Sequence, residues 1–303
     1  MTKHHPIGLY SGKWDGITNL PLALKNSSKL YPSNLGYTSV DGTAYTYREM
    51  ANSAHYLATM LSSTGVGPGQ KVAILSENSP HWGLAYFGNL ITGATTVPIL
   101  PDFQGPEIKS ILEHAEAKSL YVSGKLLHKL KEGLPPAVEL VVNLDNFQVL
   151  DVEEGKIKDP STPPGELVKL EIDAATLKED PSFYQAGKDD LASIIYTSGT
   201  TGRSKGVMLS HFNILSNAIQ SGTVHEVFPT DRFLSVLPLA HTYEGTIGMM
   251  VPLLNGAQML YPDKPPTASV LTPILRDYRP TTMLTVPMII EKIYRAKVKP
   301  ALH

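Results

Sequence analysis

The chain has no cysteine, which excludes disulfide bonds, a thiolate nucleophile and any metal site that needs cysteine ligands. It also lacks an excess of charge of either sign, because 26 basic residues against 28 acidic residues give a net charge of −2. A chain so close to neutral offers no electrostatic reason to expect a nucleic-acid partner. Its ten histidines show no H-E-x-x-H spacing, and no G-x-S-x-G motif occurs.

Long hydrophobic runs are missing as well. The most apolar stretch, residues 245–260, is interrupted by Pro252, Asn255 and Gln258, so it is too short to span a bilayer. The N-terminus shows no charged-then-apolar signal pattern, and we therefore expect a cytoplasmic protein. The sequence leaves room for a peripheral membrane contact and sets no oligomeric state. With 303 residues, of which 42% are hydrophobic, the chain can bury a sizeable core in one large domain or two.

Short apolar runs alternate with amphipathic segments over residues 46–143. Thr46 and Glu49 form a capping box at the start of the first predicted helix, and Gly65 ends it. Strands that alternate with helices of this length indicate βαβ units and a parallel sheet, so the predicted fold class is α/β. Residues 1–45 are predicted to be loops, because proline and glycine punctuate them. The predicted strands are 71–76, 95–99, 119–122, 139–143, 191–196, 207–209, 232–237 and 282–287.

A polar, glycine-spaced loop lies between two of these strands, at residues 197–202. Glycines let backbone N–H groups converge on one point, and hydroxyls and a lysine add further phosphate-binding groups. The alternative is a serine- and threonine-rich hairpin turn. The loop is not a Walker motif, because Arg203 and Ser204 separate Gly202 from Lys205. The candidate phosphate-binding residues are Thr197, Ser198, Gly199, Thr200, Thr201, Gly202 and Lys205.

The run from Tyr196 to Val207 resembles the signature Y-T-S-G-(S/T)-T-G-x-P-K-G-V of the adenylate-forming (AMP-binding) superfamily, with Ser204 at the usual proline. Residues 238–244, Pro-Leu-Ala-His-Thr-Tyr-Glu, resemble a second motif of acyl-CoA synthetases and are most similar to that of bacterial long-chain fatty-acid–CoA ligases. Further stretches resemble the opening of the same superfamily: 46–49, 66–73, 77–80 and 93–98.

This resemblance implies three-layer αβα parallel-sheet subdomains of the large N-terminal domain of such enzymes, incomplete at the C-terminus. Residues 46–143 would form a βαβ subdomain, 144–190 an irregular excursion, and 191–303 the phosphate loop and the acyl-pocket region. The mobile C-terminal domain would be absent. We therefore expect that these 303 residues alone do not complete the reaction.

The implied reaction is ATP-dependent activation of a long-chain fatty acid to an acyl-adenylate and then to acyl-CoA. The implied cofactors are ATP/AMP, Mg²⁺ and coenzyme A, with Lys205 and His241 as the catalytic residues and Thr200 as the candidate Mg²⁺ contact. The alternatives are an aryl or short-chain acyl ligase, a peptide-synthetase adenylation domain, or a non-catalytic nucleotide-binding fragment. The implied acyl-site residues are His241, Tyr243, Gly245 and Gly248.

Two features of this second motif admit more than one interpretation. Gly245 and Gly248 can leave a channel beside a helix, but they can equally let helices pack closely; the resemblance favours the channel. An ionised Glu244 beside an apolar channel would repel a fatty carboxylate and would be costly to desolvate. We therefore expect Glu244 to point away from the channel, toward a helix N-terminus.

Overall fold

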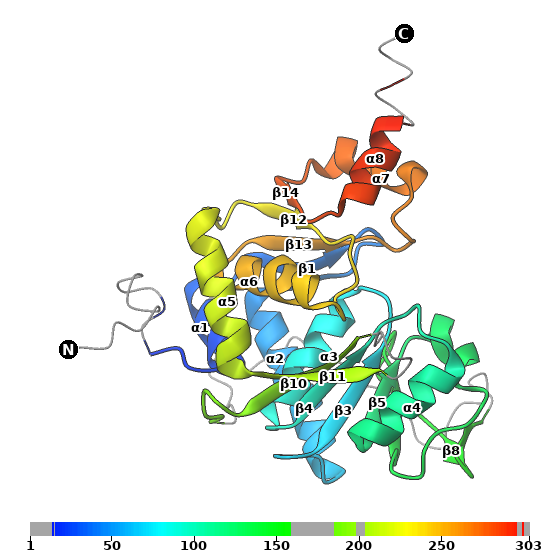
Figure 1. Ribbon diagram of the computed structural model, residues 1–303. Helices are drawn as coiled ribbons and strands as arrows, with labels where there is room; N and C mark the ends of the chain where they lie inside the picture. The colour runs from blue at the N-terminus through cyan, green and yellow to red at the C-terminus, as the bar shows by residue number, and fades with distance from the viewer. Residues whose placement is uncertain (1–13, 15, 159–184, 198–203, 296–298, 300–303) are drawn as a thin grey trace.

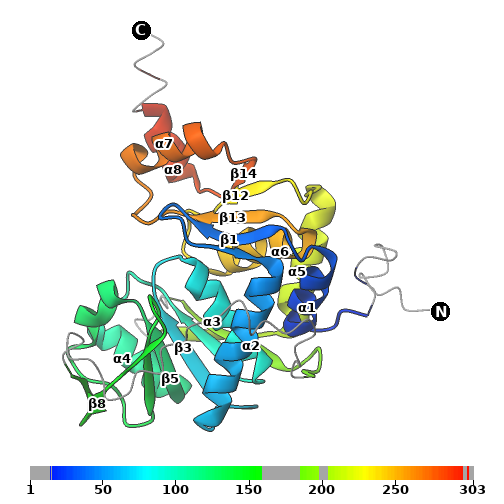
Figure 2. The same ribbon diagram turned by 180° about the vertical axis from the view of Figure 1, so that it is seen from behind.

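The computed structural model describes residues 14, 16–158, 185–197, 204–295 and 299. Two sheets form its framework, with helices between them and on their outer faces (Figures 1 and 2). Most strand pairs are parallel, which confirms the α/β class that the sequence predicts. No helix in the described ranges is long and apolar enough to cross a membrane.

The larger sheet has seven strands in the order β11-β10-β4-β3-β5-β6-β7. Its central strands are parallel, and the edge strands β11 and β7 are antiparallel to their neighbours. The central strands read as continuous apolar runs because helices cover both faces of the sheet. The strands are β3 (Lys71–Leu75), β4 (Thr95–Ile99), β5 (Ala117–Val122), β6 (Leu140–Asn143), β7 (Gln148–Leu150), β10 (Leu191–Thr197) and β11 (Lys205–Ser210).

The smaller sheet has five strands in the order β14-β12-β13-β1-β2, of which only β2 is antiparallel to its neighbour. A separate two-stranded hairpin, β8–β9, lies in the first part of the segment predicted to be irregular. The strands are β1 (Leu35–Ser39), β2 (Ala44–Thr46), β12 (Arg232–Leu234), β13 (Gln258–Tyr261), β14 (Thr282–Met283), β8 (Val152–Glu153) and β9 (Lys156–Ile157).

A layer of helices separates the two sheets. Helices α1, α2, α3, α5 and α6 lie in this layer, α4 covers the opposite face of the larger sheet, and α7 and α8 lie beyond the smaller sheet (Figures 1 and 2). The helices are α1 (Leu20–Leu30), α2 (Tyr47–Ser63), α3 (Pro80–Ile91), α4 (Gly105–Ala115), the 3₁₀-helix η2 (Gly124–Leu130), α5 (His211–Val224), the π-helix η4 (Glu244–Met250), α6 (Val251–Asn255), α7 (Ala268–Tyr278) and α8 (Pro287–Ile293).

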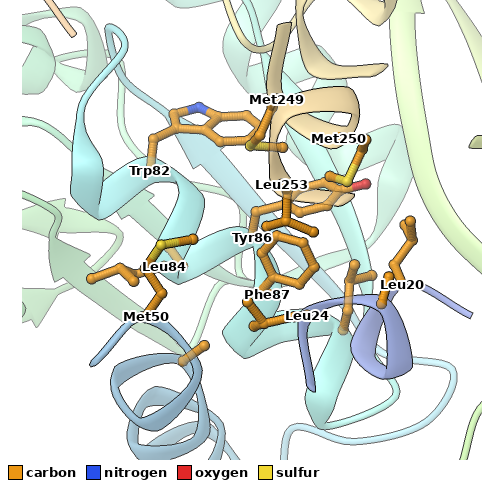
Figure 3. Packing of buried hydrophobic residues seen from close by; sticks show 14 of the residues in the cluster. Leu20, Leu24, Met50, Trp82, Leu84, Tyr86, Phe87, Met249, Met250 and Leu253 are labelled. Atoms are coloured by element: carbon orange, nitrogen blue, oxygen red, sulfur yellow. The ribbon is translucent and has the colours of Figure 1, made fainter. Parts of the chain in front are cut away.

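The main hydrophobic core fills the space within this helix layer. In Figure 3 the side chains of Met249 and Met250 come from η4 and lie near Trp82 and Tyr86 of α3. The two aromatic rings stack with centroids 5.4 Å apart, and all four residues are at most 4% exposed. Helix η4, which carries the end of the second motif, is therefore anchored to α3 by close packing.

Capping residues set the helix boundaries, and those of α2 are the ones that the sequence predicts. The capping box of Thr46 and Glu49 begins α2, and Gly65 follows its end with a φ of 80°. Ser79 accepts from the backbone N–H of Trp82 at the start of α3, and Ser210 caps α5 in the same way. Local hydrogen bonds thus fix the starts of α2, α3 and α5, of which α5 lies between the two motifs.

The prediction that residues 1–45 form only loops is wrong from residue 20 onward, where α1 begins, followed by β1 and β2. Asn19 caps α1 by accepting from Leu22 N at 2.8 Å. Pro21 occupies the first turn, where the missing N–H costs no hydrogen bond. Leu20 and Leu24 are buried in the main core, so tertiary packing stabilises a helix in a segment that was predicted to be a loop because of its prolines and glycines.

Candidate functional site

The predicted phosphate loop closes a β-hairpin formed by β10 and β11. Thr197 lies opposite Lys205 in the last strand pair before the loop, and both residues are exposed at the mouth of the hairpin. Ser198, Gly199, Thr200, Thr201 and Gly202 lie outside the described residues. Their predicted contacts with phosphate, and that of Thr200 with Mg²⁺, stay predictions.

Lys205 begins β11 with an exposed side chain that forms no ion pair with another described residue. The next residue, Gly206, lies against the neighbouring strand, where a Cβ would come within 2.8 Å of Ile194 and 3.3 Å of Tyr196. Glycine is therefore required for the hairpin to close. An exposed lysine opposite Thr197 at the mouth of the hairpin fits a phosphate ligand.

Tyr196 anchors the base of the hairpin. Its hydroxyl group lies 2.6 Å from Nδ1 of His114 on α4, and the two rings meet edge to face. Burial raises the pKa of Tyr196, so the hydroxyl keeps its proton and shares a hydrogen bond with His114. This contact fixes the end of β10 just before the loop begins.

The second motif lies in the segment that connects β12 to η4, and Asn78 holds this segment to the larger sheet. Asn78 follows the carboxyl end of β3 and makes three hydrogen bonds across to the segment. Its Nδ2 donates to Ser235 Oγ at 2.9 Å and to Leu237 O at 2.6 Å, and its Oδ1 accepts from Leu239 N at 2.8 Å. These bonds draw residues 235–239 out of the strand, so the prediction that the strand continues to Leu237 is wrong.

His241 lies in a turn in which its N–H donates to Pro238 O and its carbonyl accepts from Gly245 N, both at 2.9 Å. Its imidazole ring is exposed, and Nδ1 accepts from Tyr243 N at 3.3 Å. In the neutral ring the proton is therefore assigned to Nε2, which is left free to donate to a ligand oxygen. Tyr243 is 41% exposed beside it.

Glu244 points into the protein and not toward solvent. It is 1% exposed, and Oε1 accepts from Ser235 Oγ at 2.6 Å, whereas Oε2 has no partner. Burial raises the pKa of Glu244 to about 8, and the Ser235 hydrogen bond only partly opposes this shift. The side chain is thus neutral at pH 7. The expectation that it meets a helix N-terminus is wrong, because its partner is a serine that follows β12.

The two glycines of the predicted acyl site both lie in crowded positions. A Cβ at Gly248 would lie 2.5 Å from Glu244 Oε1, and a Cβ at Gly245 would lie 2.8 Å from Leu239 O. Close approach within the motif therefore accounts for both glycines. Their role as the walls of an acyl channel stays a prediction.

Strand register places the two motifs at the same edge of the larger sheet. Ser193 of β10 is level with Thr96 of β4, which is level with Val72 of β3. Four residues further along parallel strands, Thr197 is level with Ser76, two residues before Asn78. Two strand spacings separate them, which is about 10 Å. The hairpin mouth and the Asn78-bound segment with His241 thus share the carboxyl edge, where ligands of parallel sheets bind.

Sequence reasoning missed Asn78 and Ser235 as site residues. Asn78 belongs to the quoted Glu77-Asn-Ser-Pro80 stretch and follows a predicted parallel strand, so its position at a carboxyl edge was available as a signal. Ser235 carried no such signal, because it was placed inside a predicted strand. Its contact with Glu244 depends on where β12 ends.

The sequence profile described as "AMP-binding enzyme" matches residues 25–302, which is most of the chain. The chain belongs to the AMP-binding enzyme family. Long chain acyl-CoA synthetase 6, peroxisomal, from Arabidopsis thaliana is 31% identical over 275 residues, covering 84% of this chain and 36% of the relative. Tyrocidine synthase 2 from Brevibacillus parabrevis is 33% identical over 218 residues, covering 70% of this chain and 5% of the relative.

A solved structure shares the fold. The inhibitor-bound N-terminal domain of FACL13 from Mycobacterium tuberculosis superposes with a TM-score of 0.76 at 23% identity, covering 93% of this chain and 66% of that one. The present AMP-binding chain spans less than half the length of its curated relatives.

Of the site residues predicted for this AMP-binding chain, the structure brings Thr197 and Lys205 together across the hairpin. It brings His241, Tyr243 and Gly245 together by hydrogen bonds, and Gly248 follows in η4. Within the described ranges, no three histidine, aspartate or glutamate side chains gather into a metal site.

Proposed function

We propose that this chain carries the phosphate loop and the acyl site of an enzyme that activates a long-chain fatty acid. In this reaction the acid's carboxylate attacks the α-phosphorus of ATP, and pyrophosphate leaves. Coenzyme A then displaces AMP to give the thioester. The observation that supports the proposal is the shared edge of the sheet, where the ends of β10 and β3 lie two strand spacings, about 10 Å, apart. The phosphate loop follows β10, and Asn78, which binds the segment that holds His241, follows β3.

Each motif has a distinct role in this proposal. Lys205 and the hydroxyl and backbone groups of residues 197–202 hold the β- and γ-phosphates, so that positioning and charge stabilisation supply the catalysis. His241 donates from Nε2 to an oxygen of the acid or the adenylate. Mg²⁺, when bound to the triphosphate, would neutralise part of its charge, and Thr200 is the candidate contact. No general base is required for the first step.

The acid is proposed as long-chain because residues 238–244 resemble the motif of fatty-acid–CoA ligases and because such synthetases are among the relatives. An ionised Glu244 would have repelled the carboxylate of a fatty acid. Because burial keeps Glu244 neutral, this repulsion does not arise. The similarity to a tyrocidine synthase keeps an adenylation domain for amino acids as the second candidate. A cytoplasmic location stays a prediction, and one relative is named as peroxisomal.

Thermal shift with non-hydrolysable adenylates tests the proposal on the 303-residue chain itself. The probes are sulfamoyl adenosines that carry a palmitoyl, a benzoyl or a phenylalanyl group, with AMP and ATP beside them. We expect the palmitoyl compound to raise the melting temperature most. A larger shift with the phenylalanyl compound would support the adenylation-domain alternative, and no shift with any adenylate would contradict binding by this chain.

A turnover assay complements the binding test. ATP–pyrophosphate exchange with palmitate and Mg²⁺ is measured on the 303-residue chain and on the longest product of its reading frame. We expect robust exchange only where segments beyond these 303 residues supply the remaining nucleotide contacts. Robust exchange by the 303 residues alone would contradict that expectation and would leave the proposed chemistry supported.

A further inference from the structure

We propose that Asn78, Ser235 and Glu244 form a positioning chain that fixes the orientation of His241, an inference that rests on the proposed function. These residues come from three separate places: the end of β3, the end of β12 and the start of η4. Asn78 Nδ2 donates to Ser235 Oγ at 2.9 Å, and Ser235 Oγ donates to Glu244 Oε1 at 2.6 Å. One continuous line of hydrogen bonds therefore links the larger sheet to the second motif.

The three positioning residues hold the backbone on both sides of His241. Before the histidine, Asn78 binds Leu237 O at 2.6 Å and Leu239 N at 2.8 Å. After it, Ser235 holds Glu244, and Gly245 N donates to His241 O at 2.9 Å. Between these points the imidazole ring is exposed and has only the Tyr243 N–H as a hydrogen-bond partner among the described residues. The orientation of the imidazole ring is thus set by a backbone segment that Asn78, Ser235 and Glu244 hold in place.

Packing shows that Glu244 is built into this arrangement. Its carboxyl group occupies the space that a side chain at Gly248 would need, 2.5 Å from the position of a Cβ. The titratable side chain that acts on it from the smaller sheet is Tyr261 of β13, and the described structure gives it no basic partner. A buried carboxyl costs free energy unless its hydrogen bonds compensate. Such a carboxyl three residues after the histidine of the motif is explained if it positions that motif.

Nitrogen NMR of the histidine ring tests the proposal on the 303-residue chain, with His241→Gln assigning the signal. In the native chain we expect neutral His241 to carry its proton on Nε2. Asn78→Ala, Ser235→Ala and Glu244→Ala each remove a link, and each should lower the Nε2–H to Nδ1–H ratio about threefold, the effect of one lost hydrogen bond. Glu244→Gln keeps the acceptor oxygen and should restore the native ratio.

Asn89→Ala is the matched control, because Asn89 is a buried asparagine whose side-chain amide likewise links two elements, α3 and β4, through Thr96 at 3.2 Å. It should lower the melting temperature without changing the His241 ratio. Binding of the palmitoyl sulfamoyl adenosine should weaken about tenfold in Asn78→Ala and remain native in Asn89→Ala. Folded Asn78→Ala and Ser235→Ala chains with the native His241 ratio would overturn the positioning role. Failure of the native chain to bind any adenylate would instead contradict the proposed function, and the NMR arm would still decide the positioning chain.

Discussion

The carboxyl group of Glu244 fills the space beside Gly248, where a Cβ would lie 2.5 Å from Oε1 and 3.0 Å from Oε2. The two residues are one helical turn apart in η4, so the π-helical geometry of this segment sets their contact. Both are buried, and Glu244 has Ser235 as its hydrogen-bond partner. A glycine in the second motif is therefore explained by a neighbouring acid.

Gly248→Ala should lower the free energy of unfolding by about 2 kcal/mol, because the new methyl group displaces the carboxyl from Ser235. In a Glu244→Ala background the same change should cost less than about 1 kcal/mol, since the space is then free. Urea denaturation of the native chain, the two single variants and the double variant completes this double-mutant cycle. Gly222→Ala is the control: no atom lies within 4 Å of its Cβ position in α5, so it should be neutral or stabilising. Additive costs for Gly248→Ala and Glu244→Ala would show that the two side chains do not compete.

The contribution of Glu244 to stability should fall as the pH rises from 4.5 to 8. Burial raises the pKa of Glu244 to about 8 in the folded chain, against 4.5 in the unfolded one. Between these values the unfolded state releases a proton that the folded state keeps, so unfolding is favoured progressively. Glu244→Gln removes this dependence and should gain on the order of 4 kcal/mol over the native chain between pH 4.5 and 8. Parallel curves of unfolding free energy against pH for the two chains would contradict the buried neutral acid.

The sequence carried much of the fold because its local signals agreed with tertiary packing. The capping box of Thr46 and Glu49 was readable, and it begins a helix where expected. Helix α1 was not readable, because Pro21 punctuates a segment whose stability comes from burying Leu20 and Leu24. Parallel strands were predictable from the alternation of elements, but the division into two sheets depends on pairings between distant segments, such as β1 with β13.

For the candidate site, the motifs identified Lys205 and His241 but not the residues that hold them in position. Lys205 and His241 lie in sequence motifs that resemble known signatures, and the structure places both motifs at one edge of the larger sheet. Asn78 acts through contacts 157 to 161 residues away in sequence, which no local pattern encodes. The partner of Glu244 was predicted wrongly: an ionised acid was expected to meet a helix N-terminus, whereas burial makes the acid neutral and Ser235 is its hydrogen-bond partner.

Acid should destabilise the protein through His211, which is 2% exposed and accepts from Leu20 N through Nδ1 at 3.3 Å. Burial lowers the pKa of His211 to about 4, and the nearby Asp190 opposes this shift only in part. As the pH falls from 6.5 to 4, His211 binds a proton in the unfolded state but not in the folded state. The free energy of unfolding therefore decreases in this window. Urea denaturation at pH 7 and pH 4.5 should show that His211→Gln loses less stability than the native chain on acidification. His128→Gln, at an exposed position, is the control and should follow the native chain. An equal loss in His211→Gln would show that other groups govern acid unfolding.

Lys205→Ala should weaken pyrophosphate binding about tenfold, because the lysine is the exposed cation at the mouth of the β10–β11 hairpin, opposite Thr197. Phosphorus NMR titration of the 303-residue chain with pyrophosphate measures this effect, and native binding should weaken as salt is raised. AMP has no β- or γ-phosphate, so its affinity should change much less than that of pyrophosphate. Lys131→Ala, at another exposed lysine outside the hairpin, provides the matched loss of one positive charge and should leave pyrophosphate affinity unchanged. If Lys205→Ala and Lys131→Ala weakened binding equally, only net charge would attract the anion, and the hairpin would lose its role as the phosphate site.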